Sequence, residues 1–356
     1  MRRFGQFLVL LALGVGAALG LGAGAANRPP ARPRPLAVAA PVFDWRLPAG
    51  FPTPCVPDDN PMTEAKVALG RRLFYDPRLS ANGTQSCGSC HAPERAFTDG
   101  RGRAVGSTGI AHPRGSMTLA NVAYNSSFTW LDAHRATLEE QQLGPMLNRD
   151  PVELGLSGRE AEVMARLAAD PGYAAAFAAA FPGEPLDLTA VRKAIASFER
   201  TLLSGDSPYD RWVWRDDARA MSDAAKRGMR LFFSARLACA QCHAGFTFSG
   251  PVSFDGLAGE RPEFFDTGLG GPFRAPTLRN IAVTAPYMHD GRFATLGEVV
   301  DYYARGGGVS PGKSPRIRPF ALTPEERHEL VAFLESLTDE GFLSDPRFAA
   351  PRGDGP

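Results

Sequence analysis

Apolar residues recur at helical spacing in several parts of the chain. Within residues 189–203, Val191, Ile195, Phe198 and Leu202 fall on one face of a helix, and Thr189 is placed to cap its start. Further helices are predicted at 160–167, 171–181, 295–303 and 323–337, and the last of these opens with the capping-box pattern Thr-Pro-Glu-Glu. No stretch alternates between apolar and polar residues for long enough to build a sheet. The pattern therefore predicts an all-α fold.

The first residues follow a different pattern, that of an export signal. Arg2 and Arg3 precede an apolar run at 7–21, and small residues follow it at 22–26. This order is typical of a secretory signal peptide, which we place at residues 1–26. An uncleaved anchor is the alternative, but the run is shorter than the about 20 apolar residues that span a bilayer. We expect a periplasmic protein with no stable membrane insertion after cleavage, whose residues 27–44 form a Pro-rich leader.

Two segments share the pattern C-x-x-C-H, in which two thiols can form thioethers to one porphyrin and the adjacent His can bind its iron. A zinc site would need a second Cys or His pair nearby, and a redox dithiol would need a thioredoxin-like context. Neither context is present in the sequence. We therefore predict two covalently bound haem c groups, attached through Cys87, Cys90 and His91 in one segment and Cys239, Cys242 and His243 in the other.

The two motifs belong to an internal repeat. Residues 70–79 and 228–237 share the frame G-x-R-L-F-[YF]-x-x-R-L, and each follows a predicted helix that begins at Thr63 or Ser222. Two tandem cytochrome c-type domains are therefore expected, at 45–215 and 216–345, with a tail at 346–356. We interpret residues 206–221 as the polar joint between them.

Composition narrows the range of partners. The chain has 356 residues, with 39 Lys and Arg against 38 Asp and Glu, so its formal net charge is +1. This balance gives no electrostatic reason to expect a nucleic acid partner. Cys55 is the one cysteine outside the two motifs, and it is either a buried thiol or one half of an intermolecular disulfide.

The residue opposite each His determines what each iron can do. At the usual distance downstream, the second motif reaches Tyr303 and the first reaches Glu153, and neither is a Met. A Tyr ligand favours oxidised iron, whereas an open iron beside a carboxylate suits peroxide activation, with Glu153 moving protons and Gln141 holding the peroxide. Three alternatives are open. Glu153 and Gln141 could be solvated, Tyr303 could be a core residue, and His112 could cap the first iron in a resting state.

The sequence resembles the bacterial di-haem cytochrome c peroxidase superfamily, which includes MauG and the MbnH-like enzymes. The resemblance covers most of the chain after the leader, and its most specific stretches are residues 69–80, 138–141 with 144–145, 275–280 and 285–291. Residues 56–62 and 151–155 look most like the MbnH-like branch.

This resemblance implies a role for each of several residues. His91 lies below a catalytic first haem, Gln141 and Glu153 form its distal pocket, and Pro145 holds that pocket open. Trp130 carries electrons between the haems, and Tyr303 is the axial ligand of the second, electron-transfer haem.

The resemblance also implies hydrogen peroxide as oxidant and a periplasmic partner protein as substrate, whose Trp becomes kynurenine in the MbnH-like branch. The family also has a calcium ion between its two domains. Here Arg114 is followed by Gly115 rather than Asn, which leaves the carbonyls of Thr284 and Pro286 as candidate calcium ligands. MauG has a Trp two residues before its second haem motif, where this chain has Leu237.

Three functions follow from these observations. We favour a MauG- or MbnH-like oxidase of a partner protein. The first alternative is a peroxidase that reduces hydrogen peroxide with electrons from a small cytochrome or copper protein. The second is a non-catalytic di-haem electron carrier.

Overall fold

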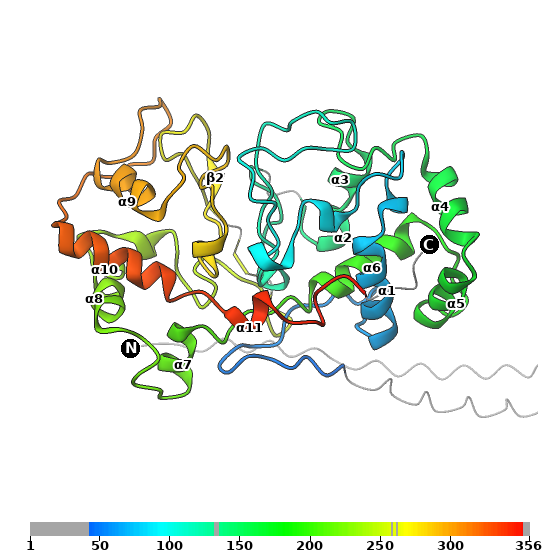
Figure 1. Cartoon of the computed structure of the whole chain (residues 1–356), viewed down its shortest axis with the longest axis horizontal. Coiled ribbons are helices and arrows are strands. Elements are labelled where there is room, and N and C mark those ends of the chain that lie inside the picture. The colour runs from blue at the N-terminus through cyan, green and yellow to red at the C-terminus, as the bar shows by residue number, and fades with distance from the viewer. Residues whose placement is uncertain (1–42, 132–134, 258, 261–262, 352–356) are drawn as a thin grey trace, which may run out of the picture. The chain divides into compact units, whose positions relative to one another are not determined.

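The computed structural model describes residues 43–131, 135–257, 259–260 and 263–351, and in this part the chain is mostly helical (Figure 1). The predicted signal peptide, most of the leader and the last five residues of the tail lie outside the described residues. The predicted helices are confirmed. The α-helices are α1 (Glu64–Tyr75), α2 (Leu138–Gln141), α3 (Leu143–Leu147), α4 (Glu160–Ala168), α5 (Pro171–Ala180), α6 (Leu188–Glu199), α7 (Pro208–Trp214), α8 (Asp223–Phe232), α9 (Leu296–Ala304), α10 (Pro324–Glu335) and α11 (Glu340–Leu343).

One small sheet accompanies the helices. Strand β1 (Phe264–Phe265) pairs antiparallel with β2 (Phe273–Arg274), with Phe264 opposite Arg274. Strands of two residues are too short to produce an alternating pattern, so they could not be predicted from the sequence. The all-α prediction is thus confirmed only as a mostly helical fold.

Two local predictions were wrong. Helix α6 is capped by Asp187, whose side chain accepts from the amide of Ala190, so Thr189 lies inside the helix rather than at its cap. The segment 206–221 is not only a polar joint, because it contains α7. The hydroxyl of Ser207 accepts from the amide of Asp210 while the Asp210 carboxylate accepts from the amide of Ser207. This capping box, together with Pro208 in the first turn, is sufficient to start a helix in a polar stretch.

The two halves of the internal repeat share one helix pairing in the structure. Helix α1 packs on α6, and α8 packs on α10 (Figure 1). At the crossings, Gly70 lies against the carbonyl of Ala194, and Gly228 lies against the carbonyl of Glu329. A Cβ atom at either glycine would come closer to that carbonyl oxygen than real Cβ atoms do. Backbone therefore meets backbone in both pairs, which only glycine permits.

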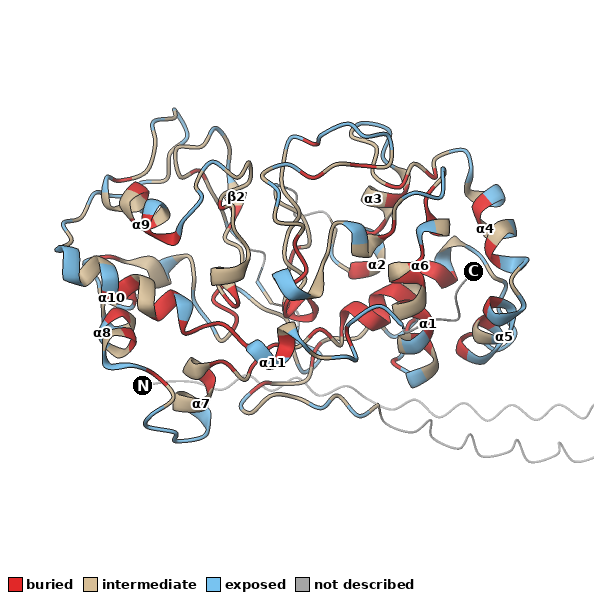
Figure 2. Ribbon diagram, viewed as in Figure 1, coloured by how far each residue is buried: buried red, intermediate tan, exposed pale blue. Residues whose placement is uncertain are grey.

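Each helix pair contributes to its own hydrophobic cluster. The first cluster contains Phe74, Phe97 and Phe198, and the second contains Phe232, Phe248 and Phe333. Buried residues lie on the facing sides of α1 and α6 and of α8 and α10 (Figure 2). Two residues of α7, Tyr209 and Trp212, pack against the second cluster. The division of the chain into two domains stays a prediction.

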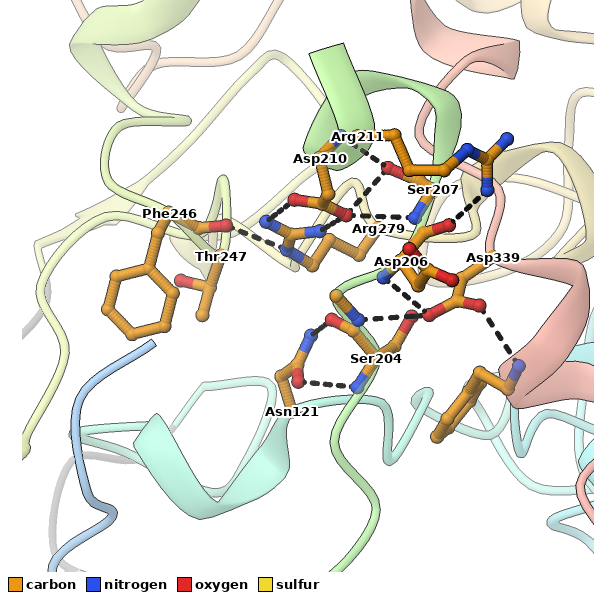
Figure 3. Close-up of polar contacts among 12 residues, drawn as sticks. Asn121, Ser204, Asp206, Ser207, Asp210, Arg211, Phe246, Thr247, Arg279 and Asp339 are labelled. Atoms are coloured by element: carbon orange, nitrogen blue, oxygen red, sulfur yellow. Dashed lines mark hydrogen bonds and ion pairs between the residues drawn. The ribbon is translucent and has the colours of Figure 1, made fainter. Parts of the chain in front are cut away.

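Buried polar side chains join the two repeats (Figure 3). Asn121 donates to the carbonyl of Ser204 and accepts from its amide, both at 2.9 Å. Its counterpart in the second repeat, Asn280, donates to the Ser204 hydroxyl at 2.9 Å and accepts from the amide of Asp339 at 2.8 Å. A buried ion pair also links α7 to the second repeat. In this pair Arg279, which precedes Asn280, contacts both carboxylate oxygens of Asp210 at 2.7 and 2.9 Å.

Substituting Gly70 with Ala tests the helix crossing. The added methyl group must push α1 away from the backbone of α6, so we expect Gly70→Ala to lower the free energy of unfolding by about 3 kcal/mol. Gly271→Ala is the matched control, because a Cβ there would meet only Phe273 at ordinary distances of 3.7 and 3.8 Å. Denaturant unfolding of both variants measures the difference. Equal stability of the two variants would contradict the close crossing.

Substituting Asp210 with Asn tests the buried ion pair. The side chains of Arg279 and Asp210 are 0% and 2% exposed, so the change leaves a guanidinium charge in the interior. We expect a loss of about 3–5 kcal/mol. Glu162→Gln breaks the exposed pairs with Arg159 and Arg166 and should cost far less, because solvent screens them. Thermal unfolding of the two variants compares them, and a small loss for Asp210→Asn would mean that water reaches Arg279.

Candidate functional site

The first Cys-x-x-Cys-His segment forms a compact turn in which the His side chain has a fixed orientation. Residues Cys87–Ser89 are a short 3-10 helix, and Nδ1 of His91 lies 2.7 Å from the carbonyl oxygen of Phe97. Because a carbonyl only accepts, Nδ1 must carry the proton, and Nε2 is left with a free lone pair. This is the arrangement that proteins use to present an imidazole to a metal.

The second segment repeats this geometry. Residues Cys239–Gln241 are again a short 3-10 helix, and Nδ1 of His243 lies 3.0 Å from the carbonyl of Phe248 and 3.1 Å from that of Pro276. Burial lowers the pKa of both imidazoles, which favours the neutral form that binds metals.

A large cavity adjoins the second segment. It is lined by Cys239, Cys242 and His243, and Tyr303 reaches it from α9. Burial raises the pKa of the Tyr303 phenol, which therefore needs a cation nearby before it can ionise. The structure thus brings the predicted ligands of the second iron to one cavity. Met117 and Met288 also line it.

Trp130 lies on the wall of the same cavity. Its indole N–H donates to the carbonyl of Gly115 at 3.2 Å, and its carbonyl accepts from the amide of Arg274 at 3.0 Å. The indole meets the ring of Phe273 edge-on at 6.3 Å, and Phe273 stacks on His289 at 4.2 Å. The cavity extends to residues 98–101, which directly follow Phe97, the residue that holds His91. Trp130 therefore lines a cavity that extends from the second segment to the residues that follow Phe97.

Arg274 is a cavity residue that the sequence analysis missed. It is 6% exposed, and its Nε atom is buried without a hydrogen-bond partner. Burial lowers the pKa of Arg274 to about 10, and no carboxylate of the described residues forms an ion pair with it. A lone Arg in a sequence carries no sign that it will be buried in this way.

The predicted distal residues of the first segment are held close to one another. The amide of Leu154 donates to the carbonyl of Pro145 at 2.8 Å, which joins the Glu153 segment to α3. Burial raises the pKa of Glu153, and the neighbouring His112 offsets part of this effect. Burial also raises the pKa of Cys90 to about 11, and the negative charges of Asp99 and Glu153 contribute. Glu153 is thus in electrostatic reach of the first haem segment.

The contacts of the other predicted site residues do not assign them a role. Nε2 of His112 lies 3.2 Å from the carbonyl of Val152, and Gln141 is half-buried on α2. The thiol of Cys55 is free and lies 3.5 Å from the carbonyl of Leu257. Thr284 and Pro286, the candidate calcium ligands, both line the large cavity. Within the described residues no three His, Cys, Asp or Glu side chains cluster to hold a metal, so a calcium site built from carbonyls stays a prediction.

Sequence reasoning also missed Gln142 and Glu199. Both are buried, and Gln142 Nε2 donates to the Glu199 carboxylate at 3.3 Å. A signal was present for Glu199, because it falls four residues after Ile195 on the apolar face of the predicted helix.

None of the helices in the described part of the chain is long and apolar enough to cross a membrane.

Comparison with known proteins identifies the family. The family model described as di-haem cytochrome c peroxidase matches residues 64–218. The methylamine utilization protein MauG of Methylorubrum extorquens is 39% identical over 305 residues, which cover 83% of this chain and 84% of that protein. The cytochrome c551 peroxidase of Pseudomonas aeruginosa is 33% identical, covering 78% of this chain and 80% of that protein.

A solved structure agrees with these sequence relatives. The crystal structure of a MauG-like protein associated with microbial copper homeostasis matches with a TM-score of 0.80 and 41% identity, covering 87% of this chain and 99% of that chain. The chain therefore belongs to the di-haem cytochrome c peroxidase family, whose members are oxidoreductases that act with peroxide and hold two haem groups.

Proposed function

We propose that this protein is a periplasmic di-haem c-type enzyme that reacts with hydrogen peroxide at its first haem and oxidises a partner protein through its second. The observation that carries this proposal is the meeting of His243 and Tyr303 in one cavity beside Trp130. A phenolate ligand stabilises oxidised iron, which suits an enzyme that stores oxidising power rather than one that passes single electrons. The export signal predicted at residues 1–26 supports the periplasm, where covalent haem attachment takes place.

The residues of the two motif segments fit two haem groups. Each Cys-x-x-Cys-His segment offers two thiols and one imidazole with a free Nε2. Arg274 adds an independent sign at the second cavity, because a buried guanidinium without a partner needs an anion. A porphyrin brings two carboxylates, and we propose that Arg274 binds one of them. When bound, the two haems supply the redox chemistry by accepting two oxidising equivalents from peroxide.

The residues of the chain would then handle substrate, protons and electrons. Gln141 donates a hydrogen bond that holds the peroxide. Glu153, in its carboxylate form, takes the proton from one peroxide oxygen and returns it to the other as the O–O bond breaks. Pro145 keeps the pocket open, and its carbonyl fixes the loop that carries Glu153. Trp130 carries electrons between the haems, so that the partner protein is oxidised away from the peroxide. Each peroxide consumes two electrons from the partner and two protons, and yields two water molecules.

The partner's oxidised side chain is proposed to be a Trp, as the resemblance of residues 56–62 and 151–155 to the MbnH-like branch implies. The likeness to a MauG-like protein associated with copper homeostasis supports this choice. Treatment of a candidate partner with peroxide and the loaded enzyme, followed by mass spectrometry of its Trp peptides, tests it.

One observation favours a second candidate, the peroxidase that draws electrons from a small cytochrome or copper protein. Met288 lines the same cavity as Tyr303. A thioether ligand would raise the reduction potential of the second haem and suit electron uptake.

Three matched variants separate the two candidates. We expect Tyr303→Phe to change the absorption and magnetic spectra of the second haem and to raise its potential, because a phenolate ligand is lost. Tyr302→Phe removes the neighbouring hydroxyl, which donates to the carbonyl of Thr267, and should leave that haem's spectra unchanged. Met288→Leu should also leave them unchanged. The opposite pattern, with Met288→Leu altering the spectrum and Tyr303→Phe silent, contradicts the phenolate ligand and favours the peroxidase.

A charge substitution tests the role of Arg274. Ferric haem carries one more positive charge than ferrous haem, so Arg274→Gln should stabilise the ferric form of the second haem. We expect its potential to fall by roughly 60 mV, the one-electron equivalent of about 1.4 kcal/mol. Spectroelectrochemical titration measures this shift. Arg318→Gln is the matched control, because Arg318 lines the same cavity but is exposed, and solvent screens its charge. Equal potentials in the two variants would show that Arg274 does not face a haem.

A further inference from the structure

Glu199 is a buried acid with few polar partners. It is the last residue of α6 and is 5% exposed. Its carboxyl group has one hydrogen bond within the described residues, from Gln142 Nε2 at 3.3 Å. The carbonyl oxygen of the Gln142 side chain is also buried and has no partner. The acid and the amide therefore form a buried polar pair in which some hydrogen-bonding atoms have no partner among the described residues.

Arg200, the cation nearest to Glu199 in sequence, forms its ion pair with a different acid. Both terminal nitrogens of Arg200 donate to the carboxylate of Glu139 at 2.8 Å. Glu139 also accepts from Asn60, which in turn accepts from Lys66. This second acid is thus compensated by its own partners, and its negative charge acts against a second negative charge on Glu199.

Physical chemistry favours a proton on Glu199. Ionising a buried carboxyl that has only one amide donor leaves a charge without adequate solvation. Burial raises the pKa of Glu199 to about 8; Gln142 and Arg200 lower it, and Glu139 raises it further. Among the described residues, Glu199 also affects the thiol of Cys87, whose pKa is raised first by burial and then by Glu199. Glu199 therefore lies in electrostatic reach of the first haem segment.

The second repeat shows what this position would hold for packing alone. The carbonyl of Ala194 faces Gly70 as that of Glu329 faces Gly228, and the carbonyl of Leu202 faces Asn121 as that of Leu337 faces Asn280. In this register Leu334 is the counterpart of Glu199. Leu334 is buried and lines the cavity of the second haem segment. An apolar residue thus suffices in the repeat where peroxide is not expected, whereas the repeat expected to react with peroxide has an acid.

We propose that Glu199 is the proton-storing acid of the first haem site. Glu153 only moves a proton from one peroxide oxygen to the other, so it adds none. Reduction still requires two protons for each peroxide, as in H2O2 + 2H+ + 2e− → 2H2O. Solvent supplies one of these protons, and Glu199 gives the other to the second oxygen of the cleaved peroxide. Its carboxylate is then reprotonated from solvent. This inference rests on the proposed function.

Single-turnover kinetics of the loaded Glu199→Gln variant test the proposal. Peroxide should remove the ferric spectrum at a rate within about twofold of the parent, because Glu153 is intact. The return to the ferric spectrum under excess reductant should slow at least tenfold. In the parent this return should also slow as the pH rises through about 8, whereas in the variant it should be slow at every pH.

The controls keep the outcomes separate. A parent-like return rate and pH profile in Glu199→Gln would overturn the proposal and leave Glu199 a packing residue. If that variant does not take up haem, Glu199→Leu replaces it, since it introduces the residue that the second repeat has at this position. A parent that does not react with peroxide contradicts the proposed function itself, and the role of Glu199 in that reaction with it.

Infrared difference spectroscopy reads the proton directly and does not depend on turnover. The parent at neutral pH should show the carbonyl band of a protonated carboxylic acid that Glu199→Gln lacks, and the band should disappear above a pH of about 8. Thermal unfolding gives the same titration. Between the ordinary pKa of 4.5 and about 8, the folded state keeps a proton that the unfolded state has lost, so the stability of the parent should fall with pH relative to Glu199→Gln. No such band, with parallel stability curves, would mean that Glu199 is ionised.

Discussion

The contact between each motif histidine and a backbone carbonyl is the constraint on which the account depends. The carbonyl of Phe97 holds Nδ1 of His91, and the carbonyls of Phe248 and Pro276 hold Nδ1 of His243. These contacts select one tautomer and direct Nε2 away from the backbone. The glycine crossings at Gly70 and Gly228 bring the helices close enough for both turns to form on the same framework. The orientation of each imidazole is thus a property of the fold and not of the five-residue motif alone.

The interest of the molecule lies in how two similar repeats differ. The second has a cavity lined by Tyr303, by Leu334 and by Arg274, whose Nε has no hydrogen-bond partner among the described residues. The first places Glu153 and Glu199 near its motif, both with a raised pKa. The first repeat therefore carries two buried acids beside its motif, and the second carries a buried phenol and a buried guanidinium. Buried polar contacts of Asn121 and Asn280 with the Ser204 segment join them.

Much of this could be predicted from the sequence, for identifiable reasons. Helices with caps such as Thr63 and Thr323 are specified by local residues, and so is the repeat of the haem motif. The start of α6 at Asp187 was missed because two capping residues compete within three positions. Arg274 and Gln142 could not be found, since their burial depends on segments that are distant in sequence. Glu199 could be predicted in part. The sequence shows an acid on the apolar face of a helix, but it does not show which residues pack around that acid.

Intact mass spectrometry of the denatured protein tests the central claim most directly. Denaturation removes any cofactor that is held only by ligation or packing, whereas thioether bonds survive it. The account predicts a chain heavier than its polypeptide by the mass of two haem groups. It also predicts that replacing Cys87 and Cys90, or Cys239 and Cys242, with Ala removes one haem mass each. A denatured chain that carries one haem or none would contradict the account.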